Sequence, residues 1–153
     1  MRYASPLWLA SFGVFFLLQA TSPGRADGPS LSPVDSYRVL KADSLNQQLA
    51  VALKKGEQWP KEPVQIALRY LGPVDGNYLS VVQDNEAVEN PHHSTVTLIA
   101  ERLFDDSVGG IWIRLALVRD NTECWKVTEI DYAERCVRGD QKGMVSFHKE
   151  PCP

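Results

Sequence analysis

Three charged side chains that are able to bind a ligand or move a proton, Glu101, Arg114 and Asp131, lie on successive β-type segments of this 153-residue chain. An arginine presents a planar fork of donors that suits a carboxylate or a carbonyl group, and a nearby carboxylate can serve as a base. Trp112 is two residues from Arg114, so both side chains face the same way on a strand. These four residues are the candidate ligand-binding residues if the strands bring them together.

The elements that must position these residues are segments in which apolar residues recur with a period of two. They cover residues 78–82, 95–104, 111–119 and 125–133, and the connections between them are polar or contain glycine. Successive strands with such short connections predict an antiparallel meander.

The loop Asp105–Gly110 sets the expected pairing of the second and third segments. If Phe104 pairs with Ile111 across this loop, one face of the two strands is almost wholly apolar. The same register places Glu101 directly opposite Arg114 on the other face, as cross-strand partners.

The last β-type segment contains an irregularity in its alternation. Its four large apolar side chains are split between two parities: Trp125, Val127, Ile130 and Tyr132. A β-bulge, which inserts one extra residue at Thr128 or Glu129, would return all four to one face. The shifted register then places Asp131 beside Arg114, and the result is a row of charges across three strands.

This row has two interpretations. In the first, Glu101, Arg114 and Asp131 form a solvated ion ladder, in which each pair contributes at most about 1 kcal/mol. In the second, a concave sheet holds Arg114 at the floor of a pocket, which binds an anionic or carbonyl-bearing ligand. The walls of that pocket would be the side chains of Trp112, Leu103 and Ile99.

Two helices are expected before the strands. Ser44–Lys55 has apolar residues at helical spacing, a Ser44/Gln47 capping-box pattern and Gly56 just beyond its end. A shorter helix is expected over Glu62–Leu71, with a proline in its first turn and a glycine after it. Trp59 lies between the helices and is expected to plug the edge of the core.

Helices followed by strands indicate an α+β fold. Two N-terminal helices packed on a curved four-stranded antiparallel meander resemble the cystatin-like and NTF2-like folds. Such a likeness of fold implies no particular activity.

The N-terminal residues 1–26 have the pattern of a cleavable signal peptide. Arg2 is followed by the uncharged run Leu7–Leu18 and then by small and turn-forming residues, which favours cleavage before Asp27. The alternative is an uncleaved membrane anchor, but the run is shorter than the roughly 20 apolar residues that a spanning helix needs. Residues 27–33 read as a flexible lead-in, and residues 34–153 as a single domain.

Charge and motifs exclude several classes of function. Removal of residues 1–26 takes away two arginines and no acid, which changes the formal net charge from −3 to about −5. An acidic domain without a basic cluster is not expected to bind nucleic acid or an anionic membrane surface. His92 and His93 are adjacent and point to opposite sides of an extended chain, so no metal site is expected, and no cofactor motif is present.

The three cysteines, Cys124, Cys136 and Cys152, all lie near the C-terminus, and export implies an oxidising compartment. A Cys136–Cys152 bond would fasten the C-terminal tail to the domain. The competing Cys124–Cys136 bond would join the two ends of one strand, which lie far beyond the roughly 7 Å that a disulfide tolerates between Cα atoms. The first pairing is therefore favoured, and it leaves Cys124 outside the bond, either buried or used between chains.

The stretch CWKVTEIDYAERCVRG, together with the later SFHKEPC, resembles small uncharacterised exported bacterial domains whose last strand ends in C-x-R-G. The resemblance covers residues 124–152 only. It implies the Cys136–Cys152 bridge and a setting in the bacterial envelope, secreted or periplasmic, and it implies no activity.

Three hypotheses for function follow. The first is a non-catalytic domain that binds a small molecule or an envelope protein through the face around Arg114 and Trp112, or through the disulfide-tied tail. The second is an NTF2-like hydrolase or isomerase that uses Glu101 or Asp131 as a base. The third is an inhibitor or stress protein that acts on an envelope enzyme through an exposed loop such as Asp105–Gly110.

Overall fold

The structure, a computed structural model, describes residues 33–120, 124–139 and 145–153. The expected signal peptide, residues 1–26, and nearly all of the expected lead-in, residues 27–33, lie outside these residues. Within the described part of the chain, no helix is long and apolar enough to cross a membrane.

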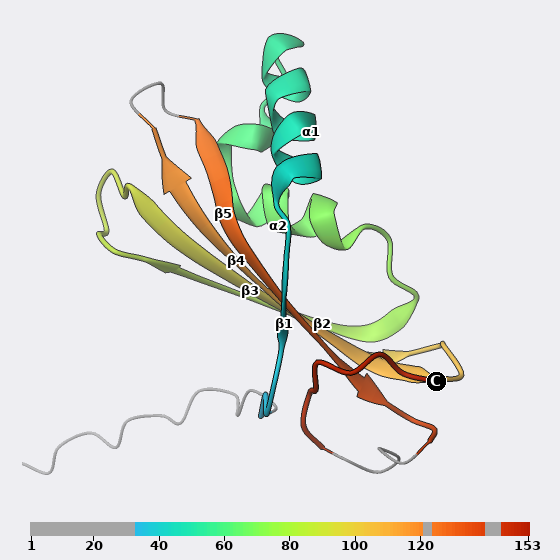
Figure 1. Ribbon diagram of the computed structural model, residues 1–153. Coiled ribbons are helices and arrows are strands. Elements are labelled where there is room, and N and C mark those ends of the chain that lie inside the picture. Colours follow the sequence, from blue (N-terminus) through green and yellow to red (C-terminus); the bar gives the residue numbers. More distant parts are fainter. Residues whose placement is uncertain (1–32, 121–123, 140–144) are drawn as a thin grey trace, which may run out of the picture. The chain divides into compact units, whose positions relative to one another are not determined.

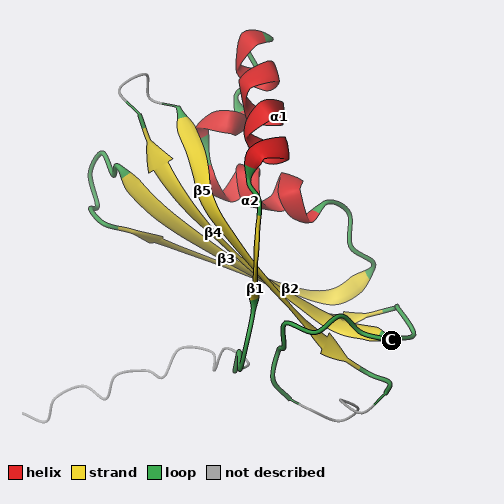
Figure 2. Ribbon diagram, in the orientation of Figure 1, coloured by secondary structure: helices red, strands yellow, loops and turns green. Residues whose placement is uncertain are grey.

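Two helices, a 3₁₀ turn and five strands make up the described fold (Figures 1 and 2). In chain order they are β1 Arg38–Leu40, α1 Asp43–Lys54, the 3₁₀ turn Trp59–Lys61, α2 Pro63–Leu71, β2 Gly76–Asn85, β3 His93–Leu103, β4 Val108–Arg119 and β5 Trp125–Cys136.

The fold is α+β, and its sheet is an open antiparallel sheet in the order β1-β5-β4-β3-β2. The expected meander is present as β2 to β5, but the expectation of four strands is wrong because β1 adds a fifth strand before the helices. Residues 38–40 of β1 pair with residues 130–132 of β5. Three residues are too few to show a period of two, which is why β1 left no pattern in the sequence.

Helix α1 lies against the sheet through a stripe of buried side chains, Leu45, Leu49 and Ala52. The helix begins at Asp43, one residue before the expected start. Ala42 is its N-cap residue, no side chain caps it, and the expected Ser44/Gln47 capping box is therefore not formed.

Helix α2 begins with Pro63, whose fixed φ and missing N–H suit the first helical position. Ile66 and Ala67 are fully buried against the sheet. The helix ends before Gly72, which has a φ of 71°, a value that favours glycine. Both helices lie on the same side of the sheet, as Figure 1 shows.

The main core fills the space between the helices and this face of the sheet. It includes Val96 and Leu98 of β3, and Ile113 and Leu115 of β4, all buried. The residues of β5 reach it because the ladder contains a bulge: Ala116 pairs with Glu129, whereas Leu117 pairs with Val127. Thr128 is the extra residue. The predicted bulge is confirmed, and the side chains on either side of it face the same core.

The C-terminal tail continues the edge of the sheet beyond β1. Glu134 pairs with His148 in the antiparallel sense, and Val34 pairs with Phe147 in the parallel sense. A disulfide joins Cys136 at the end of β5 to Cys152, with 5.4 Å between their Cα atoms, so the favoured pairing is the one present. Cys124 is half-buried.

Candidate functional site

The pairing of β3 with β4 differs from the expected register by four residues. Glu101 lies opposite Gly110, and Thr97 lies opposite Arg114. The expected cross-strand pair of Glu101 and Arg114 is therefore wrong. Because the difference is an even number of residues, the side chains that stay in the paired strands still face the expected side of the sheet.

The short turn between β3 and β4 causes this difference. The Oδ1 atom of Asp105 accepts hydrogen bonds from the backbone N–H groups of Ser107 and Val108, each at 2.7 Å. Both bonds lower the pKa of Asp105, and the bond from Val108 has the larger effect. They close a turn of residues 104–107, so Phe104 lies in the turn and is 70% exposed instead of joining the core. Half of the expected loop Asp105–Gly110, residues 108–110, belongs to β4, where Gly109 and Gly110 are buried.

Arg114 and Asp131 are direct partners across β4 and β5, as predicted. The Nε atom of Arg114 donates to Oδ2 of Asp131 at 2.8 Å, and a terminal guanidinium nitrogen donates to the same oxygen. Asp131 is only 1% exposed. Its other oxygen, Oδ1, has no hydrogen-bond partner among the described residues.

Two aromatic rings flank the guanidinium of Arg114. Its central carbon lies 5.4 Å from the centre of the Tyr37 ring and 5.7 Å from that of Trp112. Burial lowers the pKa of Arg114, but hydrogen bonding and attraction to Asp131, with a smaller contribution from Tyr37, outweigh burial and raise the pKa overall. Arg114 is thus held from three sides by the protein itself.

The expected walls of a pocket have another role. Ile99 and Trp112 are buried, and with Ala133 and the fully buried Phe147 they form a second, smaller apolar cluster. Leu103, the third expected wall, lies opposite Gly76 of the edge strand β2. The face away from the helices is therefore partly covered by the C-terminal tail.

Glu101 is separated from the other predicted site residues. Its Oε1 atom accepts a hydrogen bond from Arg135 at 2.8 Å. The structure thus brings together Arg114, Asp131 and Trp112 but not Glu101. A catalytic base beside Arg114 requires an accessible carboxylate there, and Asp131 is both buried and paired. This geometry gives no support to the hydrolase or isomerase hypothesis.

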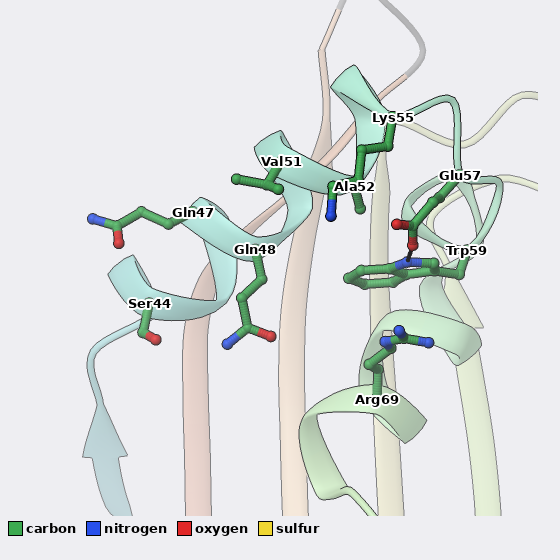
Figure 3. Close-up of a pocket in the computed structure, with 9 residues that line it drawn as sticks. All are labelled: Ser44, Gln47, Gln48, Val51, Ala52, Lys55, Glu57, Trp59 and Arg69. Atoms are coloured by element: carbon green, nitrogen blue, oxygen red, sulfur yellow. Dashed lines mark hydrogen bonds between the residues drawn. The ribbon is translucent and has the colours of Figure 1, made fainter.

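A different part of the surface, on the helices, is hollowed into an open groove. This groove of about 410 Å³ lies between the exposed side of α1 and the segment that joins the helices (Figure 3). The described residues that line it are Ser44, Gln47, Gln48, Val51, Ala52, Lys55, Glu57, Trp59 and Arg69. We call it the Trp59 groove.

The indole of Trp59 organises one end of this groove. Its Nε1–H donates to Oε2 of Glu57 at 2.5 Å. The guanidinium of Arg69 lies over the ring, 4.8 Å from its centre, and Figure 3 shows Ala52 on the opposite side. Lys55 adds a second cation. The residues that line the groove thus include two cations and one carboxylate, and that carboxylate accepts a hydrogen bond from the indole.

The sequence contained a signal for this groove. Ser44, Gln47, Gln48, Val51 and Lys55 recur at spacings of three and four, so they form one stripe of α1 beside the buried stripe. Trp59 was expected only to plug the core, and it does pack against the core. The contribution of Arg69 depends on how α2 packs near Trp59, which no spacing within one helix reveals.

No metal centre is evident in the described ranges, since no group of three or more His, Cys, Asp or Glu residues in them is arranged to hold an ion. No family model, curated protein or solved structure matches this chain.

Proposed function

We propose that this chain is an exported, non-catalytic binding domain of the bacterial cell envelope, and that its Trp59 groove binds a small ligand carrying an anionic group. Export is supported by the signal-peptide pattern of residues 1–26 and by the Cys136–Cys152 disulfide, since such bonds persist in oxidising compartments. The likeness of residues 124–152 to exported bacterial domains supports the envelope setting.

The observation that carries the ligand class is the charge around the indole. Lys55 and Arg69 are cationic, and Glu57, the one carboxylate among the residues that line the groove, is bound to Trp59. An anion placed beside Arg69 and Lys55 gains charge-assisted hydrogen bonds. Gln47 and Gln48 add donors and acceptors for the polar part of the ligand.

The proposed fold family is cystatin-like or NTF2-like. What supports it is the packing of α1 and α2 on one face of the antiparallel meander β2 to β5. The placement of β1 beside β5 is the feature to compare first when an experimental structure of such a domain is superposed.

The proposed function can be tested with matched pairs of sugars. The purified protein is titrated with galacturonic acid against galactose, and with N-acetylmuramic acid against N-acetylglucosamine, while tryptophan fluorescence is recorded. The acids are expected to change the emission and the neutral sugars are not. A Trp59→Phe variant identifies the part of the signal that comes from the groove.

Neighbouring lysines at the end of α1 provide the control. Lys55 lines the groove, whereas Lys54 is exposed and is not among the lining residues. Lys55→Gln and Arg69→Gln are each expected to weaken binding of the acids about fivefold, the loss of roughly 1 kcal/mol for an exposed ionic contact. Lys54→Gln should leave the affinity unchanged. Equal binding of acids and neutral sugars, or equal losses in both lysine variants, would contradict the proposal.

A further inference from the structure

Strand β2 forms one edge of the sheet and has a neighbouring strand, β3, on one side only among the described strands. It is ten residues long, Gly76–Asn85. Three of its large side chains are exposed on its two faces: Tyr78 at 49%, Leu79 at 43% and Val81 at 39%. Backbone donors and acceptors on the outer side of such a strand form a template for another strand.

The two edges of the sheet are built differently. The edge at β5 is covered by the three residues of β1 and then by the tail, which is held by the Cys136–Cys152 bond. Edge strands that stay single usually carry lysine, proline or a bulge that blocks pairing. Within Gly76–Asn85 there is no lysine and no proline, and Asp84 is the only charged residue.

We propose that two copies of this chain pair edge to edge through β2, antiparallel, with Ser80 on the two-fold axis. In this register the opposite pairs are Ser80 with Ser80, Leu79 with Val81, Tyr78 with Val82, Asn77 with Gln83 and Gly76 with Asp84, each residue facing its counterpart in the other copy. Apolar residues meet apolar ones and polar residues meet polar ones. The pairing needs no ligand in the Trp59 groove and is independent of the proposed function.

The faces of the sheet restrict the alternatives. Leu79 and Val81 lie opposite Ala100 and Leu98 of β3, so they face the helix side, whereas Tyr78 faces the other side. A two-fold axis perpendicular to the sheet keeps each face continuous across both copies, which requires the axis to pass through a residue. The two registers nearest to the proposed one therefore place the axis on Leu79 or on Val81.

Both of these neighbouring registers mix polar with apolar residues. Centring on Leu79 places Tyr78 opposite Ser80 and Asn77 opposite Val81. Centring on Val81 places Leu79 opposite Gln83 and Tyr78 opposite Asp84. Only the register centred on Ser80 lets the exposed apolar side chains of β2 cover one another, which is the source of its stability.

Cysteine cross-linking tests the register directly. Opposite Cα atoms in an antiparallel pair are about 4.5–5.5 Å apart, a distance that a disulfide accepts. Ser80→Cys is therefore expected to give a covalent dimer under mild oxidation, with the unsubstituted protein as the baseline. In Asn77→Cys the two new thiols would be about 20 Å apart, six strand residues, and no homodimer should form. Gln83→Cys should behave in the same way, but a mixture of these two variants should cross-link.

The solution state provides the second measurement. The purified protein is expected to form a dimer that dissociates on dilution in sedimentation velocity, because a single pair of strands buries a small interface. Leu79→Lys places a charge at an exposed position of the edge and should give a monomer with an unchanged circular dichroism spectrum.

Any of three outcomes would overturn the proposal. One is a monomer at every concentration together with no Ser80→Cys dimer. Another is equally efficient cross-linking of Ser80→Cys, Asn77→Cys and Gln83→Cys, each alone, which would indicate random collision. Cross-linking of Ser80→Cys to a different protein in preference to itself would also overturn it, since the edge would then serve a partner's strand.

Discussion

At the scale of single residues, Arg114 and Asp131 are unequal partners. The side chain of Arg114 is 38% exposed, whereas that of Asp131 is 1% exposed. If the cation is removed, a buried carboxylate keeps its charge without compensation, and this is the costly case. If the carboxylate is removed, the guanidinium still reaches water. The pair is therefore better understood as a clamp between β4 and β5 than as a ligand site.

This difference predicts the order of two substitutions. Arg114→Met is expected to lower the free energy of unfolding by about 2–3 kcal/mol, less than for a fully buried pair because Arg114 is half-exposed. Asp131→Asn should lower it by about 1 kcal/mol. The double variant should be more stable than Arg114→Met alone. Urea denaturation measures all three values, and a larger loss for Asp131→Asn than for Arg114→Met would contradict this account.

The contribution of Tyr132 to stability depends on pH. Tyr132 follows Asp131 in β5, and its side chain lies on the opposite face of the strand. Burial raises the pKa of its phenol to about 12, and the nearby carboxylate of Glu134 adds to the rise, while Arg38 lowers it. A raised pKa means that the folded protein favours the neutral phenol. The stability that Tyr132 contributes is therefore fully present below its unfolded pKa of about 10 and is lost as the pH rises toward 12.

The prediction concerns alkaline unfolding. Between pH 9 and 12 the free energy of unfolding of the unsubstituted protein should fall more steeply than that of Tyr132→Phe, measured by urea denaturation at each pH. Tyr78→Phe, on the edge strand, controls for the loss of a phenol hydroxyl elsewhere. Parallel pH profiles for Tyr132→Phe and the unsubstituted protein would show that the buried phenol has no such effect.

At the scale of secondary-structure elements, the bulge in β5 determines which side chains reach the core. Thr128 is the extra residue, and its hydroxyl donates to the carbonyl oxygen of Ala116 at 3.1 Å. The side chain of Asn46 in α1 bonds to both backbone groups of Val127, at 2.8 and 3.0 Å. The bulge therefore also fixes where α1 meets the sheet.

Deletion and substitution at Thr128 should differ sharply. Deleting the residue turns Trp125 and Val127 away from the core, because one residue reverses the parity of a strand, and the domain is expected not to fold. Thr128→Ala keeps the residue count and should cost about 1 kcal/mol for the lost hydrogen bond. Thermal unfolding followed by near-ultraviolet circular dichroism distinguishes the two, and a cooperative melt of the deletion variant would contradict the role of the bulge.

The sequence predicted which face of the sheet each side chain occupies better than it predicted which residues pair across the strands. The alternation of Trp125, Val127 and Ile130 shows which side chains share a face. Both the bulge and the pairing of Arg114 with Asp131 could therefore be predicted. Register depends on the turn, and the Asp105 side chain closes a tighter turn than the six-residue loop that the glycines suggested. A shift of four residues leaves each paired side chain on the same face of the sheet, so the apolar pattern alone did not reveal the different register. Glu101 was therefore wrongly expected opposite Arg114.

At the scale of the whole molecule, the two ends of the described chain are fastened to each other and to the sheet. The Ser146 hydroxyl donates to Asp35 at 2.6 Å, and the backbone N–H of Lys149 donates to the Ser36 hydroxyl at 3.0 Å. Phe147 lies between these contacts, fully buried over Trp112. The Cys136–Cys152 bond closes this arrangement, so the compartment in which the chain folds affects both ends.

This arrangement predicts that the disulfide and Phe147 are coupled. The chain-entropy model assigns about 3 kcal/mol to a loop of this length, so Cys136→Ser/Cys152→Ser should lose about that much stability. Phe147→Ala should lose about 3–5 kcal/mol when the bond is intact. Once the bond is absent, the tail detaches more easily and the same substitution should cost at least 1 kcal/mol less. Urea denaturation of the four proteins completes the cycle, with Val145→Ala, at an exposed position of the same tail, as the control. Additive losses would mean that the apolar cluster holds the tail without the bond, so that attachment of the tail would not depend on disulfide formation.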